Sequence, residues 1–330
     1  MPTIKKLYLN LIIYSVTFLL LTPLLSSQDF NSNPEVLDFI KKMELEYNFD
    51  KEELIKLFNS GKYQEKVVRL MDRQPEGTMT WGEYKKRIVN KNRISEGRKF
   101  IQAHQQELKR AEDIYGVPVE VITAIIGIET RYGKNKGSTR VIDSLLTLSF
   151  EYPRRAKFFK AQLENFLLLA REENLDPYIL KGSIAGAMGY GQFMPDSYRD
   201  YGVDFNFDGK RDLLNNVSDS IGSVANFLSK KGRWKPNNGI AVQAFRVYDG
   251  PKIKSTFKPT LSINELKEKG IIPLVPMMAN QKFLPIELIT ENGNEYWIGM
   301  HNYQAISRYN RSKLYIMAVV EFSNSLINSL

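Results

Sequence analysis

Glu129 is the residue whose type and setting most directly suggest chemistry, because it is an acid at the end of a strongly apolar stretch. Residues 119–128 are apolar on most faces and follow Pro118, a residue type that favours the first turn of a helix. This pattern predicts a buried helix that carries Glu129 at its C-terminal end. Burial and the negative end of the helix dipole would both raise the pKa of the carboxyl group. A rise of about two pH units would make ionisation in place cost roughly 3 kcal/mol.

An acid that keeps its proton near neutral pH can protonate a leaving group, so Glu129 suits the role of general acid. The alternative is structural: a buried glutamate that pairs with Arg131 and only holds the turn after the helix. The stretch alone does not decide between these two interpretations. The residues that surround Glu129 have to decide it.

A second informative stretch, residues 181–195, is rich in glycine and contains Ser183 and Gln192. It does not have the pattern of a phosphate-binding loop, because no Gly-Lys-Ser or Gly-Lys-Thr follows the glycines and no strand-turn-helix context surrounds them. Taken by itself, this density of small residues indicates close packing of backbone segments.

Together, Gly-Ile-Glu-Thr-Arg-Tyr-Gly at 127–133 and Gly-Ala-Met-Gly-Tyr-Gly-Gln-Phe-Met-Pro at 186–195 resemble two motifs of the lytic murein transglycosylase B family. The resemblance extends from about Thr80 to Tyr315. It implies a mainly α fold: a lysozyme-like catalytic core with additional N-terminal helices and a smaller strand-and-loop region. The implied activity is cleavage of peptidoglycan glycan strands.

The resemblance also implies a mechanism. Glu129 would protonate the oxygen between N-acetylmuramic acid and N-acetylglucosamine, then act as base on the muramic C6 hydroxyl, giving a 1,6-anhydro end. Ordinary glycosidases need two carboxylates, one of which activates water or forms a covalent intermediate. Here the nucleophile belongs to the substrate, so one acid can serve twice. No metal or organic cofactor is expected for bond cleavage.

Other positions match family residues that surround the sugar. Ser183 and Gln192 would orient polar groups of the sugar, although backbone capping within the glycine-rich loop is the alternative. Tyrosine suits a sugar cleft because its ring packs on pyranose C–H groups, although a single tyrosine is more often core or rim. One departure from the family is a phenylalanine where tyrosine is common, which keeps stacking but loses a hydroxyl contact. The substrate-binding residues that the resemblance implies are Tyr84, Arg154, Arg155, Ser183, Gln192, Phe227, Tyr309, Asn310 and Tyr315.

Arg154 and Arg155 would meet carboxylates of the lactyl group or of the peptide stem, and a solvated surface position is their alternative interpretation.

Residues 204–212 resemble the start of a calcium loop, with oxygen donors at alternate positions and a glycine at the turn. Asn215 stands at the twelfth position, where a glutamate is usual, and the family's variant uses a later carboxylate. The alternative is an Asx-rich turn without metal. The expected ligands of a structural Ca2+ are Asp204, Asn206, Asp208, the backbone oxygen of Lys210, and Asp219.

Composition is consistent with an exported enzyme of the cell wall. The 330 residues are 43% hydrophobic, which allows a sizeable core, and the net charge of +9 favours acidic partners. Such partners include nucleic acid, an anionic membrane surface or an acidic polymer such as cell-wall glycan, and charge alone does not choose among them. The basic residues follow no nucleic-acid-binding motif, so no nucleic acid is expected, and the family resemblance implies glycan strands of peptidoglycan as the partner. Residues 1–27 resemble a signal peptide, with an uncleaved membrane anchor as the alternative. The absence of cysteine excludes disulfides and thiol catalysis. We expect a periplasmic monomer.

The elements that must position these residues follow from apolar spacing. Residues 28–110 are predicted to be an N-terminal helical region, including helices over 33–70 and a long amphipathic run over 94–114. The catalytic core is predicted at 111–234, with the calcium-type loop at 204–219. Its helices should continue over 134–181, with interruptions at 152–155 and at 176–177, and a further helix should run from Ser218 to Lys231. Residues 235–330 should be strands and loops to about Gly299, then a last helix over 313–326 that completes the cleft.

Three functions remain open at this point. The first is a lytic transglycosylase that produces anhydro ends. The second is a muramidase that hydrolyses the same bond with the same acid. The third is an inactive peptidoglycan-binding scaffold recruited by its N-terminal helices.

Overall fold

Helices joined by short turns make up most of the chain, and two small sheets complete it. The computed structural model describes residues 30–71, 79–248, 253–254 and 256–327, so the predicted signal segment lies outside the described residues. The α-helices are α1 (Pro34–Tyr47), α2 (Lys51–Asn59), α3 (Glu65–Met71), α4 (Trp81–Ile88), α5 (Lys91–Ala103), α6 (Gln105–Tyr115), α7 (Val119–Thr130), α8 (Val141–Phe150), α9 (Ala156–Glu172), α10 (Pro195–Tyr201), α11 (Val217–Lys230), α12 (Ile263–Glu268), α13 (His301–Ser307) and α14 (Lys313–Ile327). The strands are β1 (Thr139–Arg140), β2 (Lys181–Gly182), β3 (Ala241–Arg246), β4 (Ile271–Pro273), β5 (Leu284–Thr290) and β6 (Gly293–Gly299), and the 3-10 turns are η1 (Phe30–Ser32) and η3 (Pro153–Arg155).

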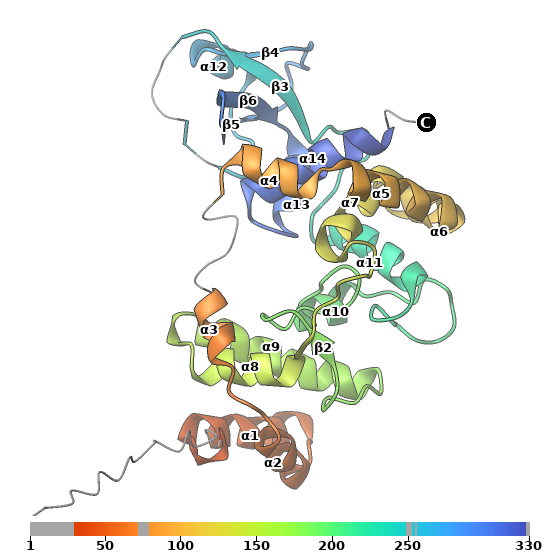
Figure 1. The fold of residues 1–330 in the computed structure, drawn as a ribbon, viewed down its shortest axis with the longest axis vertical. Helices are drawn as coiled ribbons and strands as arrows, with labels where there is room; N and C mark the ends of the chain where they lie inside the picture. The colour runs from red at the N-terminus through yellow and green to blue at the C-terminus, as the bar shows by residue number, and fades with distance from the viewer. Residues whose placement is uncertain (1–29, 72–78, 249–252, 255, 328–330) are drawn as a thin grey trace, which may run out of the picture.

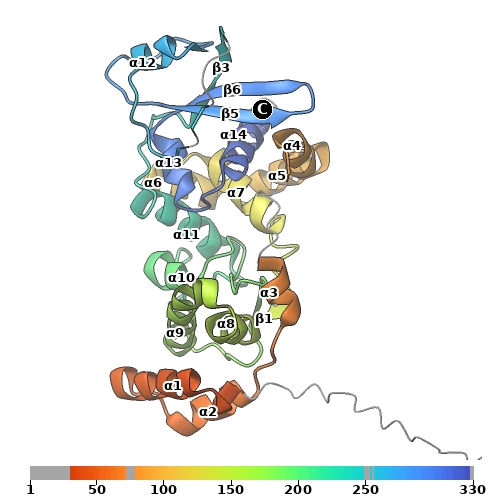
Figure 2. The same cartoon turned by 90° about the vertical axis from the view of Figure 1, so that its left-hand side faces the viewer.

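The elements form a long stack (Figures 1 and 2). Helices α1 and α2 lie at one end, next to a layer of α3, α8 and α9. The middle holds α7, with α5, α6, α11 and α14 packed around it, and the sheet of β3 to β6 lies at the other end. The prediction of a mainly α fold with a smaller strand region is confirmed. None of the helices in the described ranges is long and apolar enough to cross a membrane.

The residues predicted as one N-terminal helical region pack against two different parts of the molecule. Helix α1 joins α9, because Glu164 accepts hydrogen bonds from Lys42 (2.5 Å) and Tyr47 (2.6 Å). Helices α4 and α5 instead contact α14, and α5 and α6 contact α7. The amphipathic run predicted over 94–114 divides at His104, which ends α5 and begins α6.

The predicted interruption at 152–155 is present as η3, which separates α8 from α9, but the prediction that residues 134–140 are helical was wrong. Residues 134–140 form a turn and β1, which pairs with β2, and α8 begins only at Val141. The physical reason is that glycine at position 137 allows this turn to pack directly against the backbone of β2. Gly137 has φ +93°, and a Cβ placed on it would lie 2.1 Å from the carbonyl oxygen of Gly182, so the backbones approach too closely for any other residue.

The second sheet has the order β4-β3-β6-β5 and is antiparallel throughout. Its strands confirm the predicted change of character after Trp234, and α11 and α14 lie within one residue of their predicted ends. Helices α12 and α13 were not predicted, and α12 lies within the stretch that was expected to contain only strands and loops. The sheet joins the helical part through α4, where Trp81 Nε1 donates a hydrogen bond to Glu295 Oε2 at 3.1 Å.

Candidate active site

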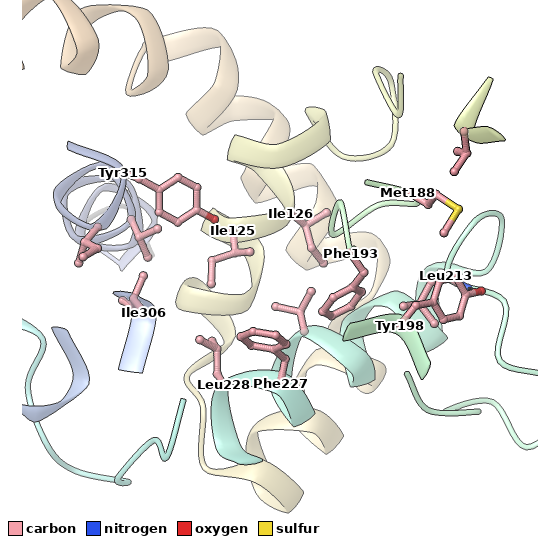
Figure 3. Packing of buried hydrophobic residues seen from close by; sticks show 14 of the residues in the cluster. Ile125, Ile126, Met188, Phe193, Tyr198, Leu213, Phe227, Leu228, Ile306 and Tyr315 are labelled. Atoms are coloured by element: carbon pink, nitrogen blue, oxygen red, sulfur yellow. Dashed lines mark hydrogen bonds between the residues drawn. The ribbon is translucent and has the colours of Figure 1, made fainter. Parts of the chain in front are cut away.

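Glu129 is the penultimate residue of α7, a helix whose other residues are almost all buried. Pro118 is the N-cap of this helix and therefore lies one residue before the first turn in which it was predicted. Glu129 itself is half-buried, and its Oε1 accepts a hydrogen bond of 2.7 Å from the hydroxyl of Tyr315 on α14. Figure 3 shows the Tyr315 ring reaching from α14 toward α7. The C-terminal helix thus fixes the orientation of the candidate acid.

The chain turns sharply after Glu129. Arg131, Tyr132 and Gly133 all have positive φ (53°, 60° and 83°), which strains the two non-glycine residues. The turn is held by Glu96 on α5, which accepts two hydrogen bonds from Arg131 (2.7 and 2.8 Å) and one from Lys134 (2.8 Å). These bonds lower the pKa of the Glu96 carboxyl to about 2. The alternative in which Arg131 pairs with Glu129 is therefore wrong, because the guanidinium pairs with Glu96.

Helices α5 and α7 come into close contact beside this turn. A Cβ on Gly97 or on Gly127 would lie 2.5 Å from the Tyr132 hydroxyl, so that hydroxyl occupies the space that both glycines leave. Arg93 Nη1 donates to the Gly127 carbonyl at 3.1 Å, and burial lowers the pKa of this guanidinium. A cation at the carboxyl end of α7 is favourable for the helix dipole.

The glycine-rich loop packs directly on the end of α7. Thr130 Oγ1 donates a hydrogen bond of 2.8 Å to the carbonyl of Tyr190. Ser183 Oγ accepts from the amides of Ala185 (3.3 Å) and Ala187 (3.1 Å). Gln192, at φ +49°, donates through Nε2 to two backbone carbonyls, at 3.0 and 3.1 Å. Both side chains therefore brace the loop.

Tyr309 connects this loop to a groove on the molecule. Its hydroxyl donates to the carbonyl of Gly191 at 2.5 Å, and its ring packs edge-on against Phe227 at 4.9 Å between centroids. Phe227 is buried next to Phe193, as Figure 3 shows, and its ring packs against that of Tyr309. Burial, followed by the charge of Glu129, raises the pKa of Tyr309 well above its ordinary value. The pKa of Tyr315 rises for the same two leading causes. Both tyrosines are thus neutral hydrogen-bond donors.

A groove of about 830 Å³ runs past Tyr309, between α4, η3, β5 and the segment before α14. Of the predicted binding residues, Arg155, Tyr309 and Asn310 line it. Tyr84 is buried on α4 and close enough to Tyr315 to contribute to its raised pKa, and Arg154 is exposed outside the groove lining. The groove is also lined by residues that were not predicted, among them Trp81, Phe158, Phe257 and Glu287.

The signal for the unpredicted residues is weak in the sequence. Thr130 lies within the Glu129 motif, and its hydroxyl at a helix end could have been recognised as a cap. Glu96 is 35 positions from Arg131, and Glu287 comes from a strand, so no local spacing connects either of them with the site.

The side chains of the calcium-type loop form hydrogen bonds with the loop's own backbone. Asp204 accepts from the amides of Asp208 (3.1 Å) and Gly209 (2.8 Å), and Gly209 has φ +88°. Asp219 is fully buried and accepts three backbone hydrogen bonds, and burial, together with the charge of Asp204, raises its pKa. Among the described residues, no three His, Cys, Asp or Glu side chains form a ready metal cluster. The oxygen donors of this set are of the type that a calcium ion prefers.

Comparison with known proteins gives a consistent result. The model of the transglycosylase SLT domain family matches residues 31–324. The membrane-bound lytic murein transglycosylase B of Escherichia coli (strain K12) is 41% identical over 307 residues, covering 90% of this chain and 84% of that protein. The E. coli lytic transglycosylase Slt35 in complex with calcium is 42% identical with a TM-score of 0.85, covering 91% of this chain and 95% of that one. SltB3 from Pseudomonas aeruginosa in complex with NAG-NAM-pentapeptide is 27% identical with a TM-score of 0.78, covering 92% and 80%.

Proposed function

This chain belongs to the transglycosylase SLT domain family and is a lytic murein transglycosylase, and we propose that Glu129 is its only acid–base catalyst. The expected lysozyme-like core is confirmed by the similarity to solved lytic transglycosylases. The observation that carries the proposal for Glu129 is its position. It is a half-buried acid, held through Oε1 by Tyr315, next to a tyrosine that lines the groove.

The proposed reaction cleaves the β-1,4 bond between N-acetylmuramic acid and N-acetylglucosamine. Glu129 gives its proton to the glycosidic oxygen as the bond to muramic C1 breaks. The resulting carboxylate then takes the proton of the muramic C6 hydroxyl as the C6 oxygen bonds to C1. The product is a 1,6-anhydro end, no water is consumed, and Glu129 is protonated again. General acid–base steps of this kind typically contribute about 10²- to 10⁴-fold in rate.

The surrounding residues position the sugar and the acid. The raised pKa values of Tyr309 and Tyr315 keep both hydroxyls protonated over the working pH range. We assign Tyr309, Asn310 and Arg155 to direct contact with the glycan, because they line the groove. Ser183 and Gln192 would contact the sugar from the glycine-rich loop, and Arg154 a more distant carboxylate. Tyr84 and Phe227 are buried and would act by supporting Tyr315 and Tyr309.

One observation favours hydrolysis as the second candidate. Glu287 also lines the groove, and a second carboxylate is what a hydrolysing glycosidase requires. However, its Oε1 lies 3.0 Å from Asn294 Nδ2, 3.3 Å from the Tyr296 hydroxyl and 3.9 Å from Arg246 Nη1. A carboxylate engaged in this way is poorly placed to activate water. Among the described carboxyl groups, only Glu129 contributes to the raised pKa of Tyr309.

We further propose that the protein works as a periplasmic monomer on peptidoglycan strands. The support is the signal-like segment over residues 1–27 and a relative described as membrane-bound. We also propose a structural Ca2+ held by Asp204, Asn206, Asp208, the backbone oxygen of Lys210, and Asp219, supported by the calcium complex of Slt35. Such an ion would stabilise the loop between α10 and α11.

The deciding experiment is product mass after digestion of purified sacculi. Transglycosylation gives muramic ends that are lighter than hydrolytic reducing ends by one water. Reducing ends alone would refute the proposal and favour a muramidase. Glu129→Gln should abolish cleavage with an unchanged melting temperature and retained binding to sacculi. An inactive scaffold would show no cleavage by the unaltered protein.

A further inference from the structure

A second concave site lies next to the groove, and the charged side chains that line it are all basic. It has a volume of about 530 Å³ and contains no carboxylate in its lining. The lining residues are Lys231, Gly232, Arg233, Lys258, His301, Gln304 and Arg308. We propose that this site, called here the basic pocket, binds carboxylates of the peptide stem on the glycan strand. The inference rests on the proposed function, because it names a further part of the same substrate.

The charges of the basic pocket are not neutralised within the described part of the chain. None of its four lysine and arginine side chains forms an ion pair there, whereas Glu96, Glu172 and Glu287 elsewhere each have basic partners. Holding four like charges around one concavity costs free energy unless an anion joins them.

Helix dipoles do not remove this excess. Lys231 is the C-cap of α11 and Arg308 is the C-cap of α13, so two helix carboxyl ends lie at the pocket. Each helix end is equivalent to roughly half a negative charge, so together they offset about one of the four positive charges. The remaining charge of about +3 favours an anionic ligand.

The pocket is held in shape by backbone contacts. Arg233 has φ +58°, and its carbonyl lies 2.8 Å from His301 Nε2 on α13. Because a carbonyl only accepts, Nε2 carries a hydrogen in this contact. Lys231 Nζ lies over the Tyr201 ring at 5.7 Å from its centroid. The carboxyl end of α11 is therefore tied to α13, which fixes the spacing of the cations around the cavity.

The position of the pocket identifies the ligand. At three places in the chain, one residue lines the groove and its sequence neighbour lines the pocket. Phe257, Tyr303 and Tyr309 line the groove, and their neighbours Lys258, Gln304 and Arg308 line the pocket. The two sites are thus separated by little more than α13, and a helix with its side chains is about 10 Å wide. An extended five-residue stem spans up to about 17 Å. A stem attached to a sugar in the groove can therefore reach the pocket with its carboxylates.

An anionic membrane surface is the main competing ligand, and the lining disfavours it. Surfaces that lie on membranes combine basic residues with exposed large apolar side chains. None of the residues that line the basic pocket is a large apolar residue, and the site is concave. A carboxylate on a flexible stem fits such a cavity better than a flat array of headgroups does.

The test compares Lys231→Gln/Lys258→Gln with the control Lys230→Gln/Lys267→Gln, which removes two exposed lysines outside the lining. Substrates are uncrosslinked glycan strands with intact stems and the same strands after an amidase has removed the stems. For stem-bearing strands we expect KM to rise roughly three- to tenfold with kcat unchanged, the size of two partly exposed ion pairs. For stem-free strands all three proteins should behave alike, and high salt should reduce the difference.

The outcomes are separable. If the unaltered protein cleaves both substrates and the pocket variant shows the same KM as the unaltered protein for each substrate, the inference is wrong. If the unaltered protein cleaves neither, the proposed function fails instead. Sedimentation with phosphatidylglycerol vesicles tests the competing ligand. If the pocket variant loses vesicle binding while its KM stays unchanged, the pocket binds an anionic membrane surface and not the peptide stem. A melting curve of each variant excludes misfolding as the cause of a raised KM.

Discussion

The hydroxyl of Tyr315 lies 2.7 Å from Oε1 of Glu129, although the two residues are 186 positions apart in the chain. The first belongs to the C-terminal helix α14 and the second to the apolar helix α7. Because Tyr315 is almost fully buried, its hydroxyl has little freedom and holds the carboxyl group in one orientation. The acid therefore depends on the end of the chain for its geometry.

Tyr315→Phe should keep the ring packing and remove only the hydroxyl. Hydrogen bonds to charged groups contribute about 1.5–3 kcal/mol, so we expect kcat on murein to fall roughly 10- to 100-fold. The matched control is Tyr47→Phe, which removes a 2.6 Å hydrogen bond to Glu164 between α1 and α9. That variant should keep full activity. Equal activity of both variants would show that the Tyr315 hydroxyl does not orient the acid.

Glu287→Gln separates transglycosylation from hydrolysis. Its carboxylate is engaged with Asn294, Tyr296 and Arg246, so the variant should retain at least about half of the cleavage rate and the same anhydro products. Glu129→Gln, measured in parallel by chromatography and mass spectrometry of the products, should be inactive. A loss of several orders of magnitude in Glu287→Gln would instead indicate a two-carboxylate mechanism.

The sequence contained enough to find the acid, because Glu129 and the apolar helix that carries it are local. The apolar helix and the turn after it are encoded within residues 118–133. The glycine-rich loop was also recognisable as a motif. Its role as a brace, with Thr130 bonded to Tyr190 and Tyr309 bonded to Gly191, depends on contacts between distant segments.

The rest could not be predicted because it arises from tertiary packing. Glu96 is the single acid of α5, among four basic residues of the same helix, and only the fold brings it to Arg131, 35 positions away. Helix α13 is short, with 7 residues, and follows a strand, so it gives little periodic signal. The basic pocket gathers residues from three distant segments, and no spacing in the chain connects them.

The stability that Glu96→Gln removes should depend on pH in a defined window. The folded-state pKa is about 2 against an ordinary 4.5, so the ion pairs stabilise the fold fully above about pH 4.5 and are lost as the pH falls toward 2. The difference corresponds to roughly 3 kcal/mol before screening. Because Arg131 and Lys134 are 45% and 59% exposed, we expect about 1 kcal/mol at pH 7.

Urea unfolding of Glu96→Gln and of the unaltered protein at several pH values checks this. The two free energies of unfolding should converge below pH 4.5. Glu291→Gln is the control, because its pair with Lys86 is exposed on both sides and should contribute less than about 0.5 kcal/mol. A constant difference down to pH 2 would mean that Glu96 stabilises the turn by packing and not by charge.

Gly127→Ala should disturb the contact between α5 and α7. The added Cβ would lie 2.5 Å from the Tyr132 hydroxyl and 3.1 Å from Phe322 Cε1, so overpacking should cost about 1–3 kcal/mol in the free energy of unfolding. Activity should fall as well, because the same turn carries Glu129. Gly82→Ala on α4 is the control: its Cβ meets nothing closer than 3.7 Å, and alanine favours a helix, so stability should stay equal or rise.

Calcium should raise the melting temperature without changing intrinsic catalysis. An ion present at about 100 times its Kd stabilises the fold by about 2.7 kcal/mol, or roughly 5 °C for a chain of this size, and a chelator should remove that gain. Asp204→Asn should abolish the calcium-dependent shift, because the carboxylate beside buried Asp219 is lost. Asp176→Asn, at an Asx turn elsewhere, should keep it. Identical melting curves with calcium and with chelator would mean that residues 204–219 form only a hydrogen-bonded turn, since the ion would then have no measurable affinity for the folded state.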